Sequence, residues 1–158
     1  MRQEQIQNFT RRISQSNRGG LVVVTYDIIL AYIEDAETAY ASADYTGFRE
    51  NLVRAQRGVD RLMQTLDFSY SVSGELYPLY VFAKEAMAKA IVKKSQDELK
   101  GAKEVLVNLQ AAFSEAAMQD RSNPLMQNTQ QVYAGITYGK HNLTETFQEP
   151  ETSRGFFA

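Results

Sequence analysis

The sequence predicts an all-α protein, an antiparallel up-down four-helix bundle with an N-terminal segment and a C-terminal arm. Two observations favour helices over strands. Between Leu21 and Met118 the chain contains a single proline, Pro78, and four glycines, which suits long uninterrupted helices. Apolar residues recur in this region at spacings of three and four, and no long stretch alternates apolar and polar side chains as a half-buried strand would.

The first core helix is predicted to begin after Asn17, a good N-cap residue, and to run to about Ala43. Its apolar residues form two stripes, whereas a surface helix normally needs one. One interpretation is a central helix that is contacted on several sides. The other is that one stripe is core and the other binds a partner, in which case we predict that the second stripe is the partner-binding one. The first stripe contains Leu21, Val24, Ile28, Ala31 and Tyr32, and the second contains Val22, Tyr26, Ile29 and Ile33.

Three further helices follow, joined by short connections that imply up-down-up-down order. Asp44 is placed to cap the second helix. Pro78 is expected in the first turn of the third, where a missing N–H is tolerated. The fourth is expected to open with a capping box from Ser95 to Glu98. Their apolar faces are Phe48, Leu52, Ala55, Val59, Leu62 and Leu66; Leu76, Tyr80, Ala83, Met87, Ala90 and Ile91; and Leu99, Ala102, Val105 or Leu106, Leu109 and Phe113.

The predicted organisation is an N-terminal segment of residues 1–17, a four-helix domain of residues 18–118 and a C-terminal arm of residues 119–158. Four apolar residues of the arm would expose a contiguous patch, which soluble monomers tend to avoid. We predict that they fold back, or across to a neighbouring copy, and cover part of the partner site. A permanent place in the core and disorder are the alternatives. These residues are Val132, Tyr133, Ile136 and Tyr138.

Catalytic and metal-binding patterns are missing from the sequence. There is no cysteine, and the single histidine, His141, has no Glu-x-x-His pair around it. Neither a phosphate-binding loop nor a nucleophile elbow is present. The formal net charge of −2 argues against nucleic acid as a partner, and the longest apolar run, Ile28 to Ile33, is too short to span a membrane. We therefore expect a cytoplasmic binding protein without catalytic residues, metal or cofactor.

Several segments resemble, in order and spacing, the flagellar secretion chaperone FliS family over residues 17–118. The segment from Thr25 to Leu30, which reads Thr-Tyr-Asp-Ile-Ile-Leu, is similar to the family's Leu-Tyr-Asp-Gly-Ala-Leu segment. Arg54-Ala55-Gln56, followed by a Thr-Leu-Asp sequence that ends at Asp67, resembles its second helix. Two isoleucines replace the family's Gly-Ala pair, and the arm has no counterpart in its common form.

The resemblance implies an export chaperone that binds the C-terminal segment of flagellin in the cytosol. Such a chaperone prevents premature polymerisation of flagellin and delivers it to the flagellar export gate, without an enzymatic step or membrane insertion. A homodimer is compatible with the sequence. Two other classes stay open: a four-helix regulatory or scaffold protein unrelated to secretion, and a small-ligand binder or enzyme.

Overall fold

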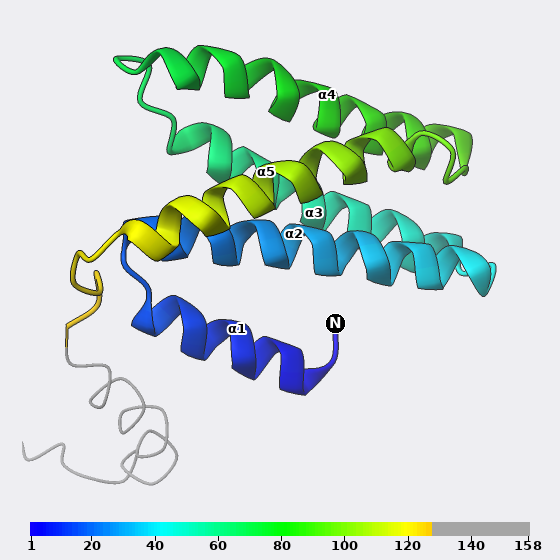
Figure 1. Ribbon diagram of the computed structural model, residues 1–158. Helices are drawn as coiled ribbons and strands as arrows, with labels where there is room; N and C mark the ends of the chain where they lie inside the picture. Colours follow the sequence, from blue (N-terminus) through cyan, green and yellow to red (C-terminus); the bar gives the residue numbers. More distant parts are fainter. Residues whose placement is uncertain (128–158) are drawn as a thin grey trace, which may run out of the picture. The chain divides into compact units, whose positions relative to one another are not determined.

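The computed structural model describes residues 1–127, and this part of the chain folds into five α-helices without a strand (Figure 1). Residues 1–126 belong to one compact unit. The prediction of an all-α protein is therefore confirmed, with one helix more than expected. The helices are α1 (Gln3–Gln15), α2 (Arg18–Ala41), α3 (Tyr45–Gln64), α4 (Ser71–Lys93) and α5 (Leu99–Gln119).

Helices α2 to α5 surround a single hydrophobic core. Helix α2 packs against α3 and α5, and α4 packs against the same two helices from the other side of the core. Helix α1 lies outside this group and packs on α2 (Figure 1). The core is therefore complete without α1.

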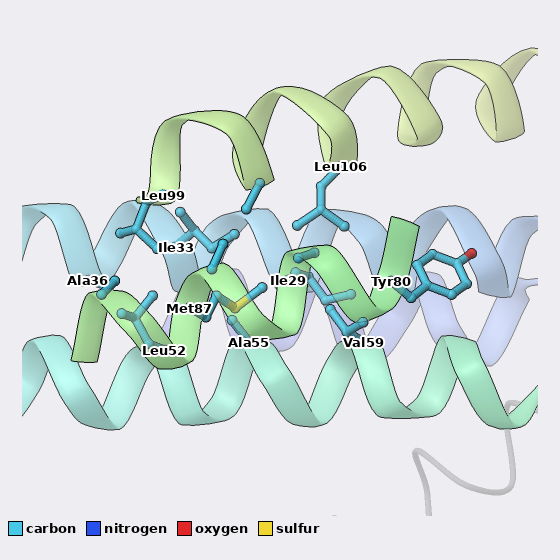
Figure 2. Close-up of a cluster of buried hydrophobic side chains, with 14 of the residues drawn as sticks. Ile29, Ile33, Ala36, Leu52, Ala55, Val59, Tyr80, Met87, Leu99 and Leu106 are labelled. Atoms are coloured by element: carbon cyan, nitrogen blue, oxygen red, sulfur yellow. The ribbon is translucent and has the colours of Figure 1, made fainter. Parts of the chain in front are cut away.

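The apolar faces predicted for α3, α4 and α5 are the faces that line the core (Figure 2). Leu66, Ile91, Leu109 and Phe113, at the margins of these faces, are only partly buried. The fully buried members are Phe48, Leu52, Ala55, Val59 and Leu62 of α3, Leu76, Tyr80, Ala83, Met87 and Ala90 of α4, and Leu99, Ala102 and Leu106 of α5.

Two predicted helix caps are confirmed. The Oδ1 atom of Asn17 accepts a hydrogen bond from the backbone N–H of Gly20 at 2.9 Å, and Asp44 Oδ1 accepts one from Gly47 at 2.9 Å. Each cap satisfies one of the N–H groups that have no partner within the first turn of a helix. The starts of α2 and α3 could therefore be predicted from single residues.

The predicted starts of the third and fourth core helices were wrong. Helix α4 begins at Ser71, so Pro78 lies inside it rather than in its first turn. Proline cannot donate to the carbonyl of Gly74 four residues earlier, but Gly74 is exposed and water can reach that carbonyl. Helix α5 begins only at Leu99, because Ser95 accepts a hydrogen bond from Asp97 N–H within a local turn instead of capping the helix.

Candidate functional site

Helix α1 lies in the region that was predicted only as an N-terminal segment. Its apolar residues Ile6, Phe9 and Ile13 recur at spacings of three and four, a signal that predicts an amphipathic helix. In the structure Phe9 and Ile13 are half-buried, Ile6 is 43% exposed, and Ser14 is the only residue of α1 that is fully buried. The helix thus rests on the surface of the core helices.

The second stripe of α2, which was predicted to bind a partner, faces the interior. Tyr26, Ile29 and Ile33 are 0% exposed, and Val22 packs at the margin of the same core. Figure 2 shows Ile29 and Ile33 among the buried side chains. The stripe therefore lines the core in the structure. The physical reason is that several helices pack on this stripe: Gly58 of α3 lies against Ile29, and Tyr80 of α4 contacts Tyr26. Direct contact with a partner stays a prediction for these four residues, and it would require the helices to separate.

The first stripe of α2 carries the surface that α1 covers. Val24 and Ala31 are buried although neither belongs to the main core. Ala31 lies between Asp27 and Asp35 at spacings of four, so the three side chains share one face of the helix. Asp27 pairs with Arg12 of α1, and Asp35 pairs with the amino group of Met1, which precedes α1. Since α2 also packs against α3 and α5, the interpretation of a central helix contacted on several sides is confirmed.

Charged contacts fasten α1 to this face. Asp27 Oδ2 lies 2.5 Å from an Nη atom of Arg12, while its Oδ1 atom accepts a hydrogen bond of 2.8 Å from Gln110 Nε2 on α5. Asp35 Oδ2 lies 2.5 Å from the amino group of Met1. This oxygen is buried and accepts no hydrogen bond of good geometry, so the ion pair is what offsets its burial.

Beside the C-terminal end of α1 the groove between α2 and α5 is incompletely filled. A cavity of about 350 Å³ remains there, with Arg12 at its edge. The chain that follows α5 passes the same junction, where Leu125 N–H donates to the carbonyl of Ser16 at 3.0 Å. The lining residues are Arg12, Gln15, Ser16, Gly20, Val23, Val24, Ser114, Ala117 and Met118.

A pair of tyrosines is the main polar feature of the core. The hydroxyl oxygens of Tyr26 and Tyr80 lie 2.6 Å apart, and the ring of Phe113 packs 5.5 Å from that of Tyr26, centroid to centroid. Burial raises the pKa of both tyrosines above the ordinary value, and the hydrogen bond between them adds to the increase for Tyr26. Both hydroxyls therefore stay neutral and serve to join α2 to α4.

Residues 1–127 contain no group of three or more potential metal ligands, and no helix among them is long and apolar enough to cross a membrane. A mixed-charge hollow of about 560 Å³ borders α2 and α5, and the ion pair of Lys103 with Glu37 at 2.8 Å lies within it. The residues predicted to cover the partner site lie outside the described residues, as does His141. They are Val132, Tyr133, Ile136 and Tyr138.

The family model of the flagellar protein FliS matches residues 1–120. The match covers α1 as well as the four core helices, so it extends beyond the residues on which the resemblance was based. No curated protein matches the chain. The matched family is one of flagellar chaperones rather than enzymes. The chain belongs to the flagellar protein FliS family.

Proposed function

We propose that this protein is a cytosolic chaperone for flagellin. It binds the C-terminal segment of flagellin, prevents premature polymerisation and delivers the segment to the flagellar export gate. Membership of a flagellar chaperone family supports the general role. The client and the delivery step are our proposal.

The observation that carries this proposal is the face of α2 beneath α1. It already holds an amphipathic helix, with the buried residues Val24 and Ala31 on the same face as the carboxylate of Asp27, which pairs with Arg12. Asp35 pairs with Met1, just before that helix. A helix from another chain could use the same apolar and charged groups, which is the usual way in which an amphipathic helix binds a groove. Because the core of α2 to α5 does not depend on α1, the exchange would leave the core intact.

The free energy of such an exchange is expected to keep client binding weak enough for a carrier that must later release its client. A flexible client must gain enough from apolar burial, at about 25 cal/mol per Å², to offset its ordering. The client must also displace α1, which is tethered directly to α2 and so competes at an effective concentration of order millimolar. This competition lowers the apparent affinity, which favours later release at the export gate.

We also propose the antiparallel up-down four-helix bundle for α2 to α5, with the three-part division at residues 17 and 118. This arrangement is supported by the short connections and by the alternating direction of successive helices in Figure 1. It keeps α1 separate from the four helices that form the core. A homodimer remains a prediction.

A tryptophan reporter on α1 tests the proposed site. The chain has no tryptophan, so Phe9→Trp gives a single fluorophore in α1. Titration of the full-length variant with a peptide of the flagellin C-terminal segment should shift the emission to longer wavelength, because Trp at position 9 leaves the α2 surface. The matched control is Phe68→Trp, in the connection between α3 and α4, whose emission should not change.

Calorimetry on the unmodified protein gives the binding itself. Binding together with the emission shift supports the whole proposal. Binding without a shift would place the client elsewhere on the molecule. No binding would favour the alternative of a four-helix regulatory or scaffold protein.

A further inference from the structure

We infer that Asp27 selects clients that carry a cationic side chain, a lysine or arginine that takes the place of Arg12 when α1 is displaced. The inference rests on the proposed function. It extends that function because the groove would recognise a cationic residue of the client as well as its apolar residues. It also assigns a role to a carboxylate that neither catalysis nor metal binding explains.

Asp27 is placed so that its carboxylate can bind a cationic side chain of a client helix. It lies in the middle of the face that α1 covers, one turn from Val24 on one side and from Ala31 on the other. Its side chain is 21% exposed even with the ion pair in place. One oxygen is held by Gln110 of α5, which orients the carboxylate so that the other oxygen points to the cation on α1.

Displacement of α1 would leave this carboxylate without its counter-ion. In the part of the chain that the structure describes, Arg12 is the only cationic group within 4.0 Å of Asp27. A client helix with an apolar residue at this position would cover a charge that keeps a single neutral hydrogen bond, from Gln110, and burying an unpaired charge is costly. A client with a lysine or arginine would restore the ion pair.

Helix α1 also indicates where that cation should lie in the client. Arg12 follows Phe9 by three residues and precedes Ile13 by one, and these apolar side chains are the half-buried ones of α1. A client helix bound in the same direction would carry its cation between two apolar residues at these offsets. Clients of this pattern should bind better than apolar helices of equal hydrophobicity.

The rival explanation is that Asp27 only anchors α1, through its ion pair with Arg12. Arg12→Gln and Asp27→Asn both remove the ion pair, so under this explanation both variants free α1 and both tighten client binding equally. Under our inference they differ, because Arg12→Gln keeps the carboxylate that the client needs. We expect full-length Asp27→Asn to bind the flagellin C-terminal peptide about fivefold more weakly than Arg12→Gln does, the upper end of what a partly exposed ion pair contributes.

Peptide variants complete the test by identifying the cation. Each lysine and arginine of the flagellin C-terminal peptide is replaced in turn by glutamine. One replacement should weaken binding to the unmodified protein about fivefold and leave binding to Asp27→Asn unchanged, a coupling that a purely structural role of Asp27 would not produce. Circular dichroism confirms that the variants are folded, and Asp27→Glu, which keeps the charge, should restore the coupling.

Two outcomes overturn different claims. Equal affinities of Arg12→Gln and Asp27→Asn for the peptide, with no coupled peptide residue, overturn the role of Asp27 in selection and leave the client site standing. Failure of the unmodified peptide to bind the unmodified protein overturns the proposed function, and the present inference with it.

Discussion

At the scale of single residues, the hydroxyl groups of Tyr26 and Tyr80 show how a polar contact is accommodated in an apolar core. Each hydroxyl belongs to a buried side chain, and the contact of 2.6 Å gives each a partner. Because burial raises the pKa of both groups above the ordinary value for tyrosine, the pair is protonated at neutral pH. The contact therefore adds a directional link between α2 and α4 to the non-directional packing of the core.

Removal of one hydroxyl should cost more than removal of both. Tyr26→Phe or Tyr80→Phe alone leaves a buried hydroxyl without a partner and should lower the free energy of unfolding by about 1–2 kcal/mol. The double variant leaves no buried hydroxyl without a partner. Its decrease in the free energy of unfolding should therefore be smaller than the sum of the two single decreases. Urea denaturation measures these values, with the exposed Tyr77→Phe as the control that should change little. Strict additivity would mean that the two hydroxyls do not interact.

A substitution at Ile29 distinguishes most directly between a structural role and a partner-binding role of the second stripe. Ile29 is 0% exposed and contacts the backbone of α3 at Gly58, so Ile29→Asp places a charge inside the core. We expect loss of helical circular dichroism at 25 °C. Ile6→Asp, on the exposed part of α1, should leave the helical signal of the core unchanged. A well-folded Ile29→Asp protein that no longer binds flagellin would instead support the predicted contact of the second stripe with the partner.

At the scale of helices, the contact of α2 with α3 depends on a position without a side chain. A Cβ atom at Gly58 would lie 2.4 Å from Cγ1 of Ile29, so the two helices pack at a distance that only glycine permits. The same contact helps to bury Ile29, whereas Tyr26 of the same stripe contacts Tyr80 of α4 and Phe113 of α5. Gly74 on α4 is different, because a Cβ atom there would meet no atom within 4 Å.

These two glycines make a matched pair of helical substitutions. Gly58→Ala should lower the free energy of unfolding by about 1–3 kcal/mol, since overpacking of the core exceeds the gain in helix propensity. Gly74→Ala should raise it by about 0.5–1 kcal/mol, because the propensity gain meets no steric cost. Thermal or urea unfolding of both variants provides the measurement. A stabilised Gly58→Ala protein would show that α2 and α3 can separate slightly at little cost.

At the scale of the whole molecule, the described residues divide into a core that is closed on itself and a helix attached to its surface. Helices α2 and α4 each pack on two core neighbours, whereas α1 packs on α2 and contributes a single fully buried residue, Ser14. One ion pair joins Arg12 of α1 to Asp27 of α2, and a second joins Met1, just before α1, to Asp35. Salt screens partly exposed pairs of this kind, so α1 is the element that solution conditions can loosen first.

Hydrogen exchange should therefore separate α1 from the core. Amide groups of α1 are expected to exchange through local opening, faster than those in the middle of α2 or α3, which open only with the core. Addition of 0.5 M salt, on the order of several times the physiological ionic strength, should increase exchange in α1 and leave α3 unchanged. Mass spectrometry of peptic fragments measures both rates. Equal protection of α1 and α2 would mean that α1 is an integral part of the core.

The sequence by itself determined the features that depend on neighbours along the chain. The periodicity of α3, α4 and α5 predicted which of their faces are buried, and Asn17 and Asp44 predicted where two helices begin, because a helical repeat and a cap are local properties. Only the tertiary structure decided which stripe of α2 is core. Both stripes are apolar, and the choice depends on the packing of α3 at Gly58, 29 residues after Ile29, and on α1, whose Arg12 pairs with Asp27. Periodicity shows that an apolar helix face must be buried, but the packing of residues distant in the sequence decides which element buries it.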